Sequence, residues 1–147
     1  MKILMVCLGN ICRSPLAQGI MENYAPNDWH IDSAGTSGWH ASERPDTRSI
    51  LIAKERGITI DQQRSRQVTV EDFEVFDIIF AMDSSNHSNL IQQAPDESAK
   101  NKVRLLLNEA YPGENRQVPD PYTGGQEGFS HVFELLEEAI QSFLRAH

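Results

Sequence analysis

The segment VCLGNICRSP, residues 6–15, joins a short apolar run to the start of a helical pattern. The run at residues 2–6 is typical of a buried strand, and the glycine and asparagine after it suit a tight turn. Beyond the turn, Ser14 can cap a helix and Pro15 fits its first position, where a missing N–H costs nothing. The segment therefore predicts a strand, a loop and a helix in succession.

The rest of the chain repeats this alternation. Further strands are expected at residues 29–33, 77–82 and 102–107, and further helices from 46 to an end at Gly57, at 84–93, and over 129–144. The alternation predicts one α/β domain spanning residues 1–147, with a parallel sheet and helices on both faces. Such sheets bind ligands at the carboxyl ends of their strands, where Cys7 is expected. Residues 111–125, rich in proline and glycine, are interpreted as a functional loop.

Charge and cysteine content limit the possible partners and the compartment. The net charge of −8 should repel nucleic acids and anionic membranes, and no apolar run is long enough to span a bilayer. The two cysteines, Cys7 and Cys12, are too few and too close for a secreted disulfide framework. We therefore expect a cytoplasmic protein with intracellular thiol chemistry.

Residues 7–14, called the phosphate loop below, have the composition of an oxyanion cradle. Backbone N–H groups converge there with the positive end of the expected helix, and Arg13 adds a planar fork for two phosphate oxygens. A cysteine at the base of such a cradle is favoured as the thiolate, so Cys7 is a candidate nucleophile. The alternative is that Cys7 is an ordinary buried strand residue. The other loop residues are Leu8, Gly9, Asn10, Ile11, Cys12 and Ser14.

The same segment resembles the signature of the low-molecular-weight protein tyrosine phosphatases. The resemblance is renewed in DSAGTSGWH (32–40), RPDTR (44–48), SRQV (65–68), AMD (81–83) and DPY (120–122). It implies a four-stranded parallel sheet and hydrolysis of protein tyrosine phosphate and small aryl phosphates through a phosphocysteine. No cofactor or metal is implied. Tyrosine-phosphorylated proteins are the implied partners, together with a cognate tyrosine kinase.

A proton donor is needed because the phenol of tyrosine, with a pKa of about 10, leaves poorly as the anion. Asp120 is the candidate, since Pro119 and Pro121 restrict the backbone on either side of it. The local sequence by itself favours a plain turn aspartate, since turns favour Asp beside Pro, and only the family match at DPY reverses this in favour of the catalytic role.

The resemblance also assigns walls and supports around the loop. Leu8, Ile11, Trp39 and Tyr122 would line a slot for a flat ring, although Leu8 and Ile11 could be core residues instead. Bracing or supporting positions fall on Asn10, Ser14, Ser33, Arg48 and Asp83. Two residues depart from the family pattern: Gln63 replaces a histidine of the bracing network, and Thr123 replaces a second aromatic.

Three other functions share parts of this pattern. Arsenate reductases of similar fold need extra cysteines in the region of the third strand, and residues 81–90 hold none. Protein arginine phosphatases typically have threonine at the position of Ile11. A non-catalytic phosphate-binding module would be expected to lack Cys7 or Asp120.

Two minor expectations concern histidine and Cys12. The five histidines are scattered without ligand spacing, so they predict surface positions rather than a metal site: His30, His40, His87, His131 and His147. Cys12 predicts a reversible disulfide with Cys7 under peroxide, the alternative being that Cys12 only packs.

Overall fold

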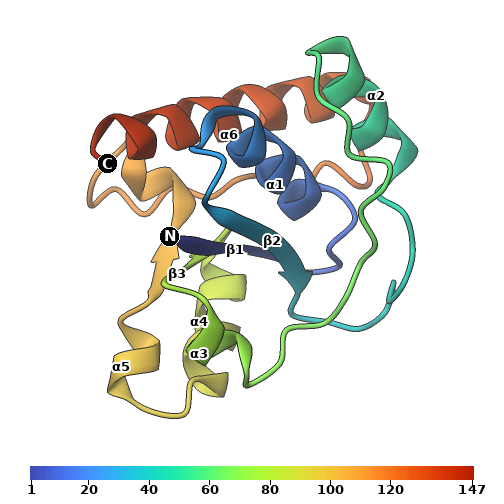
Figure 1. Ribbon diagram of the computed structural model, residues 1–147. Coiled ribbons are helices and arrows are strands. Elements are labelled where there is room, and N and C mark those ends of the chain that lie inside the picture. The colour runs from blue at the N-terminus through green and yellow to red at the C-terminus, as the bar shows by residue number, and fades with distance from the viewer.

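The computed structural model describes residues 1–147 and contains one sheet of four parallel strands in the order β2-β1-β3-β4 (Figure 1). This confirms the predicted α/β fold. Strand β1 is central, and its last residue, Cys7, pairs in register with Gly35 at the end of β2. The strands are β1 (Lys2–Cys7), β2 (His30–Gly35), β3 (Ile78–Ala81) and β4 (Val103–Leu105).

Helices cover both faces of the sheet (Figure 1). On one face α6, the longest helix, packs against α1, α2 and the 3-10 helix η1, whereas α4 packs against β3 and β4 on the other. The elements are α1 (Arg13–Tyr24), α2 (Thr47–Glu55), α3 (Asp72–Val75), α4 (Ser84–Gln93), α5 (Glu97–Lys100), η1 (Leu106–Glu109) and α6 (Gln126–Arg145). No helix is both long and apolar enough to cross a membrane.

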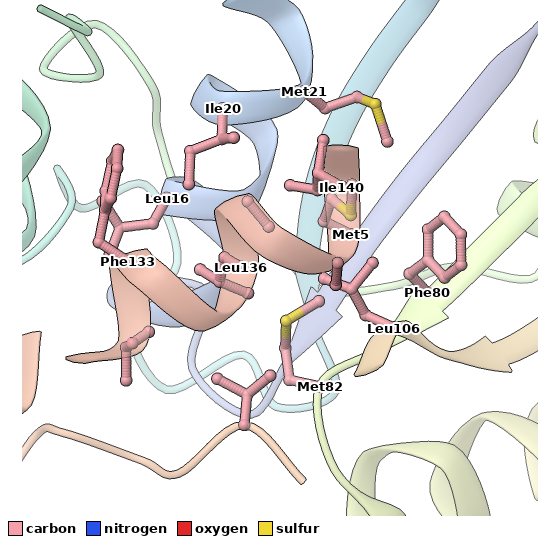
Figure 2. Packing of buried hydrophobic residues seen from close by; sticks show 14 of the residues in the cluster. Met5, Leu16, Ile20, Met21, Phe80, Met82, Leu106, Phe133, Leu136 and Ile140 are labelled. Atoms are coloured by element: carbon pink, nitrogen blue, oxygen red, sulfur yellow. The ribbon is translucent and has the colours of Figure 1, made fainter. Parts of the chain in front are cut away.

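The alternation of side chains along β1 divides the core into two layers. Ile3, Met5 and Cys7 belong to the larger cluster, with α1 and α6, while Leu4 and Val6 belong to the smaller one on the opposite face. Figure 2 shows the larger cluster, in which side chains of α1 and α6 meet those of β1 and β3. All of β1 after Lys2 is buried, so the end of the strand is a rigid base for the phosphate loop.

The amphipathic pattern over residues 129–144 is confirmed by α6. Its apolar stripe is buried at Phe129, Val132, Phe133, Leu136, Ile140 and Phe143, whereas Leu144 is only partly buried. Truncating Leu136 to alanine, which removes a fully buried side chain, should cost about 2–5 kcal/mol of stability.

Several predicted boundaries were wrong. Helix α1 begins at Arg13 after Cys12, so Ser14 does not cap it and Pro15 lies within the first turn. The Ser14 hydroxyl is instead engaged by Cys7 and Asn10. Strand β2 begins after Trp29, and β4 ends at Leu105 because the chain turns there into η1. The helices α3 and α5, four residues each, are too short to leave a periodic pattern.

Candidate active site

Neighbouring segments hydrogen-bond several carbonyls of the phosphate loop, while its N–H groups are left free. The carbonyls of Leu8 and Ile11 accept hydrogen bonds from Ser37 and Asp46, and that of Cys12 accepts one from the Ser49 hydroxyl. No backbone N–H of residues 8–12 donates a hydrogen bond within the chain. These donors follow a strand end and precede α1, whose first turn has no side-chain cap. The loop is therefore built to receive an oxyanion.

Asn10 fixes the shape of the loop. Its backbone is left-handed, with φ of 56°, a conformation that non-glycine residues seldom adopt. The side chain holds it there, because Nδ2 donates to the Ser14 hydroxyl at 2.8 Å and to the Ser33 hydroxyl at 3.0 Å, and Oδ1 accepts from the Arg66 N–H. Gly35 is required beside it, since a Cβ there would lie 2.7 Å from the Leu8 carbonyl oxygen.

The two cysteines occupy different surroundings. Cys7 Sγ lies 3.0 Å from the Ser14 hydroxyl, which can donate to a thiolate, and only 3% of the residue is exposed. Burial raises the pKa of Cys12 to about 12, with smaller contributions from Asp46, Cys7 and Asp120. Cys12 is thus a thiol at neutral pH, whereas Cys7 is the sulfur that lies within hydrogen-bond reach of the Ser14 hydroxyl. Both cysteines are free.

Arg13 lies between the loop and two carboxylates. Its NH1 donates to Asp83 Oδ2 at 2.7 Å and to the Val118 carbonyl at 3.0 Å, while NH2 is 3.8 Å from Asp120 Oδ2. Burial opposes its charge, but Cys7, Asp83 and Asp120 outweigh that effect and raise the pKa of Arg13 above its ordinary value. The guanidinium is therefore a permanent and well-oriented charge beside Cys7.

Asp120 lies in the acid loop, defined here as residues 118–125. The loop begins at buried Val118, whose N–H donates to the Met82 carbonyl at the end of β3. Asp120 is exposed, and its Oδ1 accepts from the Tyr122 N–H at 3.1 Å. Its carboxyl reaches the same space as Cys7, Arg13 and Tyr122.

These groups surround a pocket of about 150 Å³ with Cys7 at its base. The exposed fractions of the lining residues show that the pocket is deep. Cys7 and Ile11 are buried, whereas Leu8, Trp39 and Tyr122 are 39%, 77% and 47% exposed at the rim. The full lining is Cys7, Leu8, Gly9, Ile11, Cys12, Arg13, Trp39, His40, Asp120 and Tyr122. The structure thus brings together the predicted nucleophile, arginine, acid and walls.

A model of the family described as low molecular weight phosphotyrosine protein phosphatase matches residues 2–147 of the chain. The chain belongs to this family. The low molecular weight phosphotyrosine protein phosphatase of Schizosaccharomyces pombe is 40% identical to it, over 99% of this chain and 96% of that protein. The phosphatase is accordingly a cysteine-dependent hydrolase.

Solved structures resemble the phosphatase over nearly its whole length. A protein tyrosine phosphatase from Entamoeba histolytica, with Hepes in its active site, has a TM-score of 0.91 at 39% identity and covers 99% of this chain and 95% of its own. A Drosophila arginine phosphatase has a TM-score of 0.92 at 33% identity, with coverage of 99% and 97%.

His40 is partly exposed, as a surface histidine would be, but it was not predicted as a residue of the site. It lines the pocket next to Trp39, with 29% of its side chain exposed, and its Nδ1 lies 2.9 Å from Glu43 Oε2. The ring is packed against Gly9, where an added Cβ would lie 3.0 Å from its Cδ2. Its place in DSAGTSGWH, directly after a wall residue, was the available indication.

Among the predicted supporting residues, Ser33 and Asp83 support the phosphate loop, whereas Arg48 contacts the acid loop. Ser33 braces the phosphate loop through Asn10 and donates its hydroxyl to Gln18 Oε1, while Asp83 holds Arg13 and caps α4 through the Asn86 N–H. Arg48 makes no hydrogen bond to the phosphate loop and donates instead to carbonyls of the acid loop.

The hydrogen bonds of Gln63 and Arg66 show which residues brace Asn10 and the phosphate loop in this chain. Gln63 donates to the Pro15 carbonyl at 3.1 Å and does not reach Asn10, and its Oε1 is buried without a partner. Arg66 was not predicted: its N–H holds Asn10, and its side chain bridges Asp32 and Asp72. No group of three or more His, Cys, Asp or Glu side chains is close enough to hold a metal ion.

Proposed function

We propose that the phosphatase hydrolyses protein tyrosine phosphate and small aryl phosphates through a phosphocysteine on Cys7, with Asp120 as general acid and then general base. One observation carries the proposal. Buried Cys7, Arg13 and Asp120 line one largely apolar pocket, and the Asp120 carboxyl lies 3.8 Å from the Arg13 guanidinium. A nucleophile, a phosphate clamp and a proton donor therefore face the same space.

In the first half-reaction the Cys7 thiolate attacks phosphorus, and the bond from phosphorus to the phenolic oxygen breaks. Arg13 and the free N–H groups of the phosphate loop hold the three equatorial oxygens as charge spreads over them. Asp120 gives its proton to the departing oxygen, so that the neutral phenol leaves.

In the second half-reaction a water molecule attacks the phosphocysteine. Asp120, now a carboxylate, takes a proton from that water, and the bond from sulfur to phosphorus breaks to restore the thiolate and release phosphate. The Ser14 hydroxyl, 3.0 Å from Sγ, stabilises the thiolate as leaving group here and as nucleophile in the first step. One carboxyl serves both half-reactions.

The depth of the pocket supports a preference for tyrosine. The rim residues Leu8, Trp39 and Tyr122 are large and apolar, while Cys7 is almost fully buried below them. A phosphorylated phenol can span this depth with its ring against the walls, whereas a serine phosphate would leave its backbone in collision with the rim.

Phosphoarginine is the second candidate substrate, because an arginine phosphatase is among the similar structures. Ile11, buried at the base of the walls, favours the aromatic ester, since its bulk and lack of polar atoms suit a ring better than a guanidinium.

A peptide assay tests this function. Three peptides of identical sequence, carrying phosphotyrosine, phosphoserine or phosphoarginine, are compared for wild type and for Ile11→Thr. We expect kcat/KM for phosphotyrosine to exceed the others by at least about a hundredfold. A preference of the wild type for phosphoarginine would contradict the proposal, and a shift toward phosphoarginine in Ile11→Thr would identify Ile11 as the selecting residue.

Inhibitors test the cradle separately. Vanadate and phosphate should compete with substrate, because the free N–H groups and Arg13 accept a trigonal or tetrahedral oxyanion. Chelators should leave activity unchanged, and a requirement for added metal would contradict the mechanism.

The cellular setting is inferred from the same site. We propose that residues 1–147 act as a single catalytic domain on tyrosine-phosphorylated proteins, opposing a cognate tyrosine kinase. The two free cysteines fit a reducing compartment, which supports a cytoplasmic location.

A further inference from the structure

The acid loop is held from outside by very few contacts. Between residues 119 and 125 only Pro121 is buried, and the hydrogen bonds from Tyr122 to Asp120 and from Gly124 to Pro121 are internal to the loop. Arg48 is the only side chain outside the loop that hydrogen-bonds these residues. It donates from NH2 to the Tyr122 carbonyl and from NH1 to the Gly124 carbonyl, both at 2.8 Å.

Arg48 is itself locked by Asp46. Its Nε donates to Asp46 Oδ1 at 3.0 Å and its NH2 to Oδ2 at 2.9 Å, a fork-to-fork pair that fixes the plane of the guanidinium. The same plane lies over the Phe129 ring at 4.5 Å. The hydrogen bond from Arg48 lowers the pKa of Asp46 below its usual range, so the pair stays ionised throughout the neutral range.

Asp46 also contacts the phosphate loop. Its backbone N–H donates to the Ile11 carbonyl at 2.7 Å, and Ser49, one turn further along α2, donates to the Cys12 carbonyl at 3.3 Å. The beginning of α2 therefore touches the phosphate loop through Asp46 and the acid loop through Arg48.

We infer that Asp46 and Arg48 form a bridge that sets the distance between the phosphate loop and the acid loop, and thereby positions Asp120 over the leaving oxygen. Both are positioning residues, because neither lines the pocket. The inference rests on the proposed role of Asp120 as general acid. Without the bridge residues 119–125 lose the only side-chain hydrogen bonds they receive from outside the loop, and a misplacement of Asp120 by about 1 Å can cost about a hundredfold in rate.

The test measures the phosphorylation step by single-turnover kinetics on two esters. One is a phosphotyrosine peptide, and the other is an aryl phosphate whose phenol carries electron-withdrawing groups and leaves without a proton. Arg48→Ala should slow the first by roughly 10- to 100-fold and the second by less than about threefold. The competitive inhibition constant of vanadate should stay within about twofold of wild type, because the cradle is intact.

Two further variants sharpen this expectation. Arg48→Lys should rescue little, because an ammonium cannot bond both carbonyls while pairing with both oxygens of Asp46. Asp46→Asn keeps the backbone bond to Ile11 but loses the ion pair, so a smaller loss of roughly 3- to 10-fold is expected, again confined to phosphotyrosine.

Arg56→Ala is the matched control. Arg56 follows the same helix, lies over Phe133 of α6 at 5.0 Å, and pairs with Glu134, but it contacts neither loop. Arg56→Ala should leave the rate of the phosphorylation step unchanged for both esters.

A double-mutant cycle keeps the test independent of folding losses. In an Asp120→Ala background, Arg48→Ala should cost less than about threefold on phosphotyrosine, because there is no acid left to misplace. Equal losses on both esters for Arg48→Ala, no loss at all, or full additivity with Asp120→Ala would overturn the bridge. If Asp120→Ala alone slows the two esters equally, the proposed acid fails instead.

Discussion

The phosphate loop and the acid loop meet at one pocket but are built differently. In the phosphate loop Cys7, Asn10, Arg13 and Ser14 are buried, and side-chain hydrogen bonds hold even the left-handed turn at Asn10. The acid loop is exposed at Asp120 and at Tyr122. Under the proposed mechanism, the difference means that phosphate binding is preorganised by the fold, whereas protonation and substrate choice depend on a segment held by fewer contacts.

Removing the chemistry of the phosphate loop should have the largest effect. Cys7→Ser and Arg13→Ala should each reduce turnover by at least about a thousandfold, because nucleophile and clamp are both required in one step. Arg13→Lys should remain severely impaired, since it keeps the charge without the fork. Steady-state assays on a phosphotyrosine peptide measure the loss, with thermal unfolding as the control for folding. Near-normal hydrolysis by Cys7→Ser or Arg13→Ala would contradict the proposed mechanism.

Trimming the exposed rim should have a smaller effect of another kind. Trp39→Ala should raise KM for a phosphotyrosine peptide by roughly 3- to 30-fold with kcat nearly unchanged, because the indole packs against the ring in ground state and transition state alike. Tyr24→Ala, an exposed aromatic at the far end of α1, serves as control. A fall in kcat without a change in KM would show that Trp39 takes part in the reaction itself.

The high pKa of Cys12 predicts selective alkylation. Burial raises the pKa of Cys12 to about 12 and keeps it a thiol at neutral pH, so iodoacetamide should modify Cys7 in preference to Cys12. Labelling of Cys12 should rise only as the pH climbs toward 12. Peptide mapping with and without phosphate checks this, and modification of Cys12 at neutral pH in the Cys7→Ser variant would contradict it.

Peroxide should inactivate the enzyme reversibly through a disulfide between Cys7 and Cys12. Peroxide oxidises the Cys7 thiolate to a sulfenic acid, and Cys12 then displaces the hydroxyl, forming a disulfide and releasing water. A thiol reductant should restore wild-type activity, whereas Cys12→Ser should recover only partly because its sulfenic acid oxidises further. Equal recovery of both proteins would mean that Cys12 only packs.

The same contrast explains how much could be predicted from the sequence. The phosphate loop was found from VCLGNICRSP because the strand, the turn and the helix that shape it are all local, and α6 was found from its 3.6-residue period. Contacts between loops distant in sequence leave no such pattern. His40 at the rim, Arg66 on Asn10 and the reach of Arg48 to the Tyr122 carbonyl, 74 residues away, therefore required the structure.

Ser14 was misplaced for a related reason. A serine before proline is a typical helix cap, and local rules assign it no other partner. Here the hydroxyl is turned inward by Asn10 and Cys7, so the helix is left uncapped at the point where its N–H groups face the pocket.

The central claim, that the acid loop supplies the proton while the phosphate loop supplies the rest, is tested most directly by the leaving-group dependence of Asp120→Ala. The phosphorylation step is measured by single-turnover kinetics on phosphotyrosine and on an aryl phosphate with an electron-withdrawing phenol, with exposed Asp28→Ala as control. The account predicts a loss of about 100- to 10,000-fold for phosphotyrosine and almost none for the activated ester. Equal losses for both would show that Asp120 only shapes the loop, and Asp83 would be the next carboxyl to test.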